Sequence, residues 1–438
     1  MAFKIPYGEE TIQFKLPDHW QLVALAEPQK KKGFTQKKIA KKLKKIFQDP
    51  IGCEPLKDLI EFTERVVIVV DDISRPTPTQ MIIEPLIDYL TEEIGLPKGN
   101  INIIFGLGIH RNMTQEDAEK KLGEKIARVI HWENHHPYKN CVSLGQSPLG
   151  TPVKINKTFM EADFTIAIGL IEPHLWAGYS GGYKAIIPGI SGIETIVKNH
   201  ELVMEPDAKV GNIETNPLRR DIDMIGERIQ LGFLINCIMN IAGEICEIVG
   251  GGAIAAHSKG VDVARDMYEI PVKETADVVI TSAAPLGIDF RQSSKAAFNT
   301  TEALRKGGVM IVTSPCPEGV GNLRVTEKTP KRGFIKFLTK VLPSAMLMSQ
   351  VRKQGYGIED APSVYQMFKF IAKKNYLFVT KGFTEEDREK VFVADHATTL
   401  EEAFTLADKL LKNEEKKKTV KVTIFPYGGS SYPRMEEE

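Results

Sequence analysis

The chain contains a small set of residues whose types and positions could carry acid–base, metal-binding and anion-binding chemistry. His110, His174 and Arg75 each follow a predicted strand, Lys184 lies in a glycine-rich loop, and His200 lies on a predicted helix. Two imidazoles on different strands could act on opposite faces of one carbon centre, and an arginine can bind a carboxylate through two parallel hydrogen bonds. These residue types favour proton or hydride transfer on a small 2-substituted acid, because inversion at carbon needs an acid/base group on each face.

The stretch from residue 164 to residue 200 is expected to organise this site. Residues 164–170 form a short apolar run, which is typical of a buried parallel strand, and this strand leads to His174. Residues 177–190 contain four glycines around Lys184, so the sequence predicts a tight loop whose backbone can approach a ligand closely. The alternatives are an ordinary glycine-rich loop, or a phosphate cradle without any lysine chemistry.

A helix is predicted directly after this loop. Ser191 and Glu194 fit a capping box, with Ser191 as the N-cap. His200 continues the apolar stripe of Ile193 and Ile196, so we expect its imidazole to face inward and to need a partner. A core histidine bonded to a backbone carbonyl is the alternative to a ligand-binding role.

Two further predicted strands, residues 66–70 and 102–105, deliver Arg75 and His110. The prolines at 76 and 78 favour an extended backbone, which would fix Arg75 just past the end of its strand. The alternative is that Arg75 only pairs with Asp71 or Asp72. Because the carboxyl ends of parallel strands meet at one edge of a sheet, we expect these residues and His174 to form a composite site there.

The predicted fold class is α/β, with two domains that each contain a mainly parallel sheet flanked by helices. The domain limits are 1–272 and 273–412, with 413–438 expected to return to the first domain and the active site expected in the crevice between domains. In the second domain a helix over 294–306 follows the strand 277–281. Gln292 and Lys295 lie three positions apart near the start of this helix and would be neighbours.

The composition excludes several classes of protein. Lysine plus arginine balances aspartate plus glutamate at 57 each, so the net charge does not favour binding to nucleic acid or to an anionic membrane. The lysine-rich residues 30–45 contain an amphipathic helix, and the lysines most simply form its solvated face; a nucleic-acid or membrane contact is the alternative. No segment resembles a signal peptide or a membrane span, so a cytoplasmic protein is expected. The five cysteines form no CxxC pair, which argues against disulfides or a cysteine-only zinc site.

A dense histidine cluster, His131, His135 and His136, could suggest zinc. We interpret it as a surface loop after a strand at 127–130, because helical patterning is absent there.

Four separated motifs occur in an order that resembles the lactate racemase family, the nickel pincer nucleotide enzymes. They are DDISRPTP (71–78), GLGIHR (106–111), EPHLWAGYSGGYKAIIPGISGIETIVKNH (172–200) and FRQSSKA (290–296). The resemblance implies that Lys184 is joined through a thioamide to the cofactor, pyridinium-3-thioamide-5-thiocarboxylic acid mononucleotide with nickel. It further implies that His200 is the protein's nickel ligand, and that Asp72, Arg75 and Gly182 contact the cofactor.

The same resemblance implies a mechanism. His110 and His174 alternate as base and acid at the substrate hydroxyl while hydride moves between the α-carbon and the cofactor. Arg75, Gln292 and Lys295 would orient the carboxylate and carbonyl of a 2-hydroxy acid. Enzymes that synthesise the cofactor are implied as partners.

Two departures from the family pattern bear on the substrate. Arg291 stands where lactate-specific members carry a tyrosine, and Tyr183 stands where an arginine is frequent. If Arg291 reaches a second carboxylate or further hydroxyls, the substrate is larger or more polar than lactate. A zinc-dependent hydrolase or lyase built on His110, His174 and His200 is the alternative enzyme class.

Overall fold

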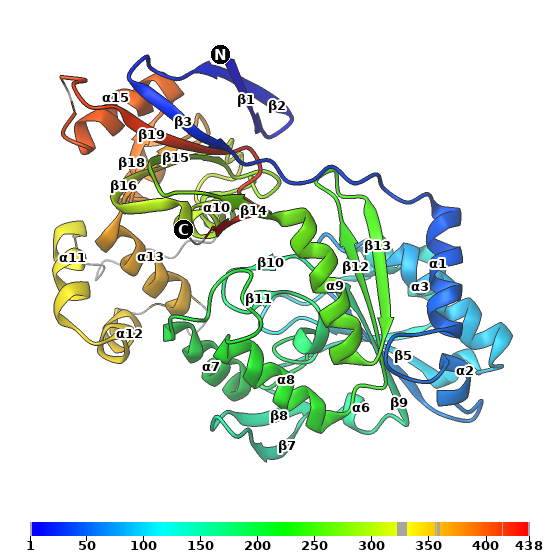
Figure 1. The fold of residues 1–438 in the computed structure, drawn as a ribbon. Coiled ribbons are helices and arrows are strands. Elements are labelled where there is room, and N and C mark those ends of the chain that lie inside the picture. The colour runs from blue at the N-terminus through cyan, green and yellow to red at the C-terminus, as the bar shows by residue number, and fades with distance from the viewer. Residues whose placement is uncertain (1, 322–330, 355, 357–359, 414, 437–438) are drawn as a thin grey trace. The chain divides into compact units, whose positions relative to one another are not determined.

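A computed structural model of the chain describes residues 2–321, 331–354, 356, 360–413 and 415–436. Its contacts divide the chain into two compact units (Figure 1). One unit comprises residues 30–267, and the other comprises residues 1–29 with 268–438. Within the described residues, no helix is long and apolar enough to cross a membrane.

The 30–267 unit is built on a six-stranded sheet with the order β13-β12-β9-β4-β5-β6. Its strands are β4 (Val66–Asp71), β5 (Ile101–Gly106), β6 (His131–Asn134), β9 (Phe164–Leu170), β12 (Phe233–Met239) and β13 (Ile245–Gly251). Only the β12–β13 pairing is antiparallel among these neighbours. β4 reads as an unbroken apolar run because both faces of a parallel sheet are covered, and every residue from Val66 to Val70 is buried.

Helices cover both faces of this sheet. They are α1 (Gln36–Gln48), α2 (Leu56–Leu59), α3 (Gln80–Asp88), α4 (Gln115–Leu122), α5 (Glu124–Val129), α6 (Lys157–Met160), α7 (Ile193–Glu201), α8 (Pro217–Ile229) and α9 (Ala253–Tyr268). Shorter pieces are η1 (Tyr89–Glu93), η2 (Lys98–Asn100), η3 (Gly182–Ala185), η4 (Leu202–Met204), and the hairpins β7 (Cys141–Gln146) with β8 (Pro152–Asn156) and β10 (Pro173–His174) with β11 (Gly178–Tyr179).

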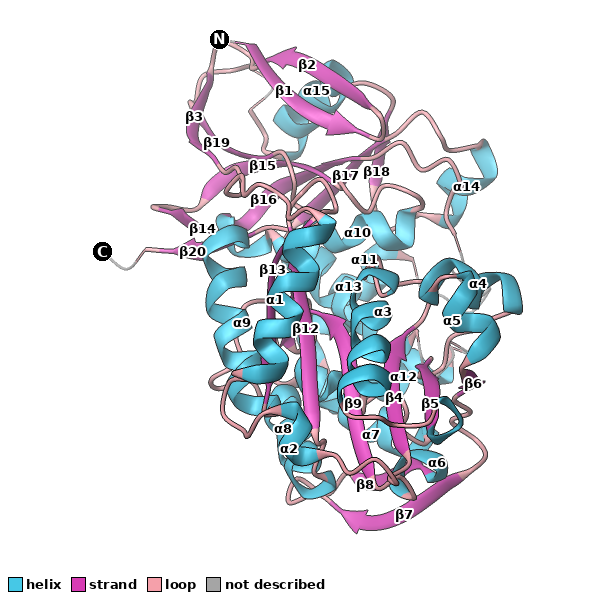
Figure 2. Cartoon of the chain, turned by 90° about the vertical axis from the view of Figure 1, so that its right-hand side faces the viewer, coloured by secondary structure: helices cyan, strands magenta, loops and turns pink. Residues whose placement is uncertain are grey.

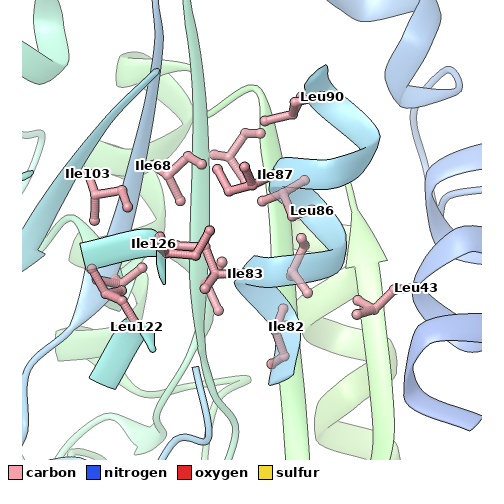
Figure 3. Packing of buried hydrophobic residues seen from close by; sticks show 14 of the residues in the cluster. Leu43, Ile68, Ile82, Ile83, Leu86, Ile87, Leu90, Ile103, Leu122 and Ile126 are labelled. Atoms are coloured by element: carbon pink, nitrogen blue, oxygen red, sulfur yellow. The ribbon is translucent and has the colours of Figure 1, made fainter. Parts of the chain in front are cut away.

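The period of two along β4 separates two cores. Ile68 belongs to a cluster that includes side chains of α1, α3, α4 and α5, several of which Figure 3 shows. Val67 and Val69 belong to a second cluster that includes side chains of α8. Figure 2 shows α1 and α3 in front of the strands of this sheet. The predicted amphipathic helix in the lysine-rich segment is confirmed, because α1 buries Ile39, Leu43, Ile46 and Phe47.

The other unit contains an all-parallel six-stranded sheet with the order β18-β17-β16-β15-β19-β3. Its strands are β3 (Trp20–Leu25), β15 (Ala276–Ser282), β16 (Leu304–Thr313), β17 (Asn375–Val379), β18 (Asp395–Ala397) and β19 (Val420–Phe425). Its helices are α10 (Phe290–Asn299), η5 (Thr301–Ala303), α11 (Arg332–Val341), α12 (Ser344–Lys353), α13 (Ala361–Lys373), α14 (Glu385–Lys390) and α15 (Leu400–Leu410). Two small pairings complete it: β1 (Ala2–Tyr7) with β2 (Glu10–Lys15), and β14 (Glu269–Val272) with β20 (Tyr432–Met435).

The α/β class with mainly parallel sheets flanked by helices is confirmed, but the predicted domain limits are wrong at both ends of the chain. β19 does not return to the first domain: it pairs with β15 on one side and with β3 on the other. In Figure 1 the blue β3 lies beside the red β19. Residues 1–29 therefore belong with 268–438, because a parallel strand at the edge of β19 satisfies its backbone hydrogen bonds.

Candidate active site

The strand order of the 30–267 unit places β4 between β5 and β9, so the loop that follows β4 lies between the two histidine-bearing loops. Asp71 at the end of β4 is in register with Gly106 of β5, and Val70 is in register with Ile168 of β9. Neighbouring strands are about 4.8 Å apart, so the loops with His110 and His174 start roughly 10 Å from each other, on either side of the Arg75 loop.

His110 is held by a carboxylate from the neighbouring loop. Its Nδ1 lies 2.6 Å from Asp72 Oδ2 and 3.3 Å from Ser74 Oγ, and Ser74 Oγ donates to Asp72 Oδ1 at 2.5 Å. Burial alone would raise the pKa of Asp72, but the hydrogen bonds from His110 and Ser74 outweigh it and the pKa is lowered. An ionised Asp72 accepts the Nδ1 proton of His110, which leaves Nε2 as the nitrogen that can accept a proton.

His174 is held by hydrogen-bond donors, whereas His110 is held by a carboxylate acceptor. It lies in β10, and its Nδ1 accepts the backbone N–H groups of Trp176 and Ala177, each at 3.2 Å. A nitrogen that accepts two donors carries no proton, so a neutral His174 has its proton on Nε2. The indole of Trp176 lies edge-on to both His174 and His200, with ring centroids 6.1 Å and 5.2 Å away.

Arg75 does not pair with Asp71 or Asp72. Lys121 Nζ binds Asp71 Oδ1 at 2.6 Å and donates to the Arg75 carbonyl at 2.9 Å, while the Arg75 guanidinium lies 3.9 Å from Glu172 Oε1. Burial raises the pKa of Asp71, although Lys121 opposes this shift. The buried Lys121 therefore fixes the backbone of the Arg75 loop and leaves the guanidinium toward the β9 side.

Lys184 lies in η3, at the end of a loop in which Gly178, Gly181 and Gly182 have the positive φ that favours glycine. Gly178 has φ +74° and Gly182 has φ +62°, and a Cβ on Gly182 would lie 2.9 Å from His257 Cγ. Burial lowers the pKa of Lys184 well below its ordinary value, and Arg219 and Arg75 add to this effect. Among the described residues no side chain or carbonyl is in hydrogen-bond or ion-pair contact with Lys184 Nζ. Burial therefore favours the uncharged amine of Lys184, the form that acts as a nucleophile.

His200 lies near the end of α7, and burial lowers its pKa to about 3. The predicted helix is present, but its N-cap is Gly192, which makes no side-chain capping bond, and not Ser191. Ser191 Oγ instead donates to the Ile186 carbonyl at 2.7 Å, and Glu194 pairs with Lys154 at 2.6 Å. No backbone carbonyl of the described residues holds the His200 imidazole, which is neutral and is thus in the form that binds metals.

These residues fit a covalently tethered, metal-containing group better than a metal held by the protein alone. Burial favours the neutral amine of Lys184 and the neutral imidazole of His200. The described residues contain no group of three or more His, Cys, Asp or Glu side chains that could hold a metal ion. The zinc alternative built on three histidines therefore has no geometric support.

The histidine cluster at 131–136 does not follow the predicted strand 127–130. Residues 124–129 form α5, and β6 begins at His131. His135 is fully buried, binds the Ser191 carbonyl through Nε2 at 2.9 Å, and has its pKa lowered to about 4 by burial. His135 therefore does not lie on a surface loop: its hydrogen bond supports the backbone at the end of the glycine-rich loop.

Three buried residues that the sequence did not single out contact the Lys184 loop. They are Arg219, Asn236 and His257, which bind backbone groups between Ala177 and Gly182. The burial of Arg219 could have been predicted from the sequence, because it lies three and seven positions before Ile222 and Gly226 on the buried face of α8. Asn236 lies within an otherwise apolar strand, and His257 lies on a helix of mixed polarity. Neither sequence pattern indicates whether the polar side chain has a functional role or only packs in the core.

The predicted substrate-binding residues of the other unit lie on α10, which starts at Phe290 rather than at 294. Asp289 caps this helix by accepting the Gln292 N–H at 2.7 Å, so Gln292 and Lys295 lie on its first turns. Arg291 Nη2 binds Asp360 Oδ1 at 3.0 Å.

Known proteins resemble the chain along its whole length. The profile of the lactate racemase N-terminal domain matches residues 7–211. The lactate racemases of Thermoanaerobacterium thermosaccharolyticum and Lactiplantibacillus plantarum are each 28% identical over 440 residues, covering 98% of this chain and 98% of each relative. A solved structure of the lactate racemase apoprotein from Thermoanaerobacterium thermosaccharolyticum matches with a TM-score of 0.84 and 27% identity, covering 99% of this chain and 100% of that one. A crystal structure of a Thermotoga maritima protein shares the fold, with a TM-score of 0.65 and 19% identity over 93% of this chain and 100% of that one.

The domain match, the full-length relatives and the fold agree with the four motifs. Residues 7–211 therefore resemble the N-terminal domain of lactate racemase, and the whole chain is similar in sequence and fold to lactate racemases, which are isomerases.

Proposed function

We propose that the protein racemises or epimerises a small 2-hydroxy acid, with a nickel pincer nucleotide joined to Lys184. The observation that carries the proposal is the arrangement around β4: an arginine loop with a histidine loop on each side. A carboxylate bound by Arg75 would place the α-carbon between His110 and His174. This arrangement suits a reaction that must work on both faces of one carbon.

The two histidines have complementary tautomers at the start of a turnover. His110 accepts the hydroxyl proton at Nε2, and Asp72 stabilises the imidazolium that forms. His174 Nε2–H is oriented by the amides of Trp176 and Ala177 and donates to the same oxygen when the opposite stereoisomer forms. In the reverse direction the two histidines exchange roles.

The chemistry that the nickel pincer nucleotide supplies when bound is reversible acceptance of hydride from the α-carbon. Loss of this hydride and of the hydroxyl proton leaves a 2-keto acid, whose carboxylate stays bound to Arg75 so that either face can be reduced. Lys184, whose buried amine is favoured in its neutral form, would hold the cofactor covalently, and the neutral imidazole of His200 would be the protein's ligand for nickel. Asp72 and Gly182 would line the same cofactor.

Three residues of α10 are proposed as substrate-binding groups. Gln292 and Lys295 provide an amide and an ammonium for the carboxylate and the carbonyl. Arg291 is the candidate reader of a second carboxylate or of further hydroxyls, because a salt bridge to Asp360 at 3.0 Å can be exchanged for one to a substrate. We therefore propose a substrate that is larger or more polar than lactate.

The test is intact-mass and metal analysis of the wild-type protein and the Lys184→Ala variant, both produced with the cofactor-synthesis enzymes. A mononucleotide-sized adduct with nickel, absent from the variant, is the expected result. The loaded enzyme is then given single stereoisomers of 2-hydroxy acids in D₂O. Hydride transfer predicts that the inverted product keeps its α-hydrogen; incorporation of deuterium at the α-carbon would instead require proton abstraction and would refute the mechanism.

A further inference from the structure

Arg219 has the largest volume among the fully buried side chains of the described residues, with 1% of its surface exposed. It lies in the first turn of α8, and its guanidinium donates to three carbonyls of one loop. Nε donates to Ala177 O at 3.4 Å, Nη1 to Gly181 O at 3.4 Å, and Nη2 to Tyr179 O. A single carboxylate, Asp223, lies 3.4 Å from Nη1 at the edge of this cluster.

A guanidinium is an unfavourable choice for filling space in this position. Burying a charge costs free energy that one ion pair does not recover, and an apolar side chain of similar volume is often as stabilising. The planar fork of five N–H donors is instead suited to binding several acceptors in fixed directions. Arg219 uses it on alternate carbonyls of residues 177, 179 and 181, so its contacts define the path of the loop.

The loop is held from two further sides. Asn236 Oδ1 accepts the Gly182 N–H at 2.8 Å, and His257 Nε2 donates to the Ser180 carbonyl at 2.9 Å. A Cβ on Gly181 would lie 2.7 Å from Asn236 Oδ1, so the supporting side chains press directly against the backbone. Buried groups from three elements thus fix one short stretch of chain.

The contact between Arg219 and the Gly181 carbonyl connects Arg219 to Lys184. The Gly181 carbonyl that accepts from Arg219 Nη1 also accepts the backbone N–H of Lys184 at 3.3 Å. The turn η3 therefore starts from a carbonyl that Arg219 holds, and the direction of the Lys184 side chain depends on that turn.

We infer that Arg219 is a positioning residue: it fixes the loop 177–184 through three carbonyl contacts and thereby aims the Lys184 amine for cofactor attachment. The inference rests on the proposed function of Lys184, but the holding of the loop can be measured without the cofactor.

Three variants separate the carbonyl contacts from the charge. Arg219→Lys keeps a buried cation and loses the fork. Arg219→Gln carries no charge to bury, so it is expected to fold even if Arg219→Lys does not. Asp223→Asn is the matched control, because it removes the ion pair on the same helix and leaves the three carbonyl contacts in place.

The first readout is amide hydrogen exchange of the apoprotein, followed by mass spectrometry. Both Arg219 variants are expected to speed exchange in peptides covering 177–186 by about ten- to a hundredfold, with β9 peptides and Asp223→Asn unchanged. Unchanged loop exchange in both variants, or equal acceleration in β9, would overturn the inference.

The second readout is the fraction of Lys184 that carries the adduct when the proteins are produced with the cofactor-synthesis enzymes. It should fall at least about fivefold in the Arg219 variants and stay at the wild-type level in Asp223→Asn. Faster loop exchange with a wild-type adduct fraction would refute the aiming role. If the wild-type protein itself carries no adduct, the proposed function fails, while the exchange data still decide whether Arg219 holds the loop.

Discussion

Replacing Asp72 by asparagine tests the acid–base assignment of His110 most directly. The side-chain carbonyl of the new amide can still accept the Nδ1 proton, so the tautomer of His110 is kept and only the negative charge is lost. Asp72 is buried and its oxygen lies 2.6 Å from Nδ1, which favours a strong interaction, but the His110 side chain is 50% exposed and water screens the charge. A charge-assisted hydrogen bond exceeds a neutral one by about 1–2 kcal/mol, which predicts a roughly 5- to 30-fold lower kcat.

The assay follows racemisation from each pure stereoisomer with enzyme of equal adduct content. No substitution changes the equilibrium constant between the stereoisomers, so kcat/KM must fall by the same factor in both directions. Ser74→Ala is the matched control, since it removes only a neutral donor to the same carboxylate and should have a smaller effect. A change below about twofold in Asp72→Asn would refute the role of the carboxylate. A loss as large as that of His110→Ala, with a reduced adduct fraction, would show that Asp72 mainly holds the cofactor.

Three further predictions concern stability and specificity. Burial lowers the pKa of His135 to about 4, so the unfolded chain binds the proton first and stability falls as the pH drops from about 6.5 toward 4. His135→Gln keeps a donor for the Ser191 carbonyl but cannot titrate, so the wild type should lose about 2 kcal/mol more than the variant between pH 7 and pH 5 in urea unfolding; equal losses would contradict this. Gly182→Ala should cost about 1–3 kcal/mol more than Gly150→Ala, because both glycines have positive φ but only Gly182 is crowded, by His257; equal costs would mean that the crowding relaxes freely. Arg291→Ala should raise KM for a 2-hydroxy diacid far more than for lactate, and Asp360→Asn should lower KM for the diacid; equal effects on both substrates would exclude Arg291 from the substrate site.

The sequence predicts an element correctly where its structure depends on burial, turns and caps within the same stretch of chain. β4, β5 and β9 are buried on both faces, so each is a short apolar run that ends at a proline- or glycine-containing loop. Since parallel strands align their carboxyl ends, the edge that carries Arg75, His110 and His174 could be predicted without knowing the strand order. The α10 motif was also identifiable, although its helix starts four residues earlier than expected because Asp289 provides the cap.

Errors arose where the outcome depends on a distant partner. β19 has the same apolar pattern as a strand of either sheet, and only pairing with β15 and β3 decides between them. Ser191 has the residue type of an N-cap, yet its hydroxyl binds the Ile186 carbonyl because the loop folds back over it. The pairing of Asp71 with Lys121 instead of Arg75 depends on α4, which follows about fifty residues later in the chain.

The protonation states in the site follow from these distant contacts and not from residue type. A lysine in a glycine-rich loop is an ammonium ion by default, and as such it could only bind an anion. Burial removes the water that stabilises the charge, and Arg219 and Arg75, from α8 and the β4 loop, add positive charge nearby. Likewise, two histidines with the same intrinsic chemistry become different, because one faces a carboxylate and the other two amides. The motifs therefore specify which groups are present, whereas the packing of the sheet around β4 determines which of them can give a proton, accept one or act as a nucleophile.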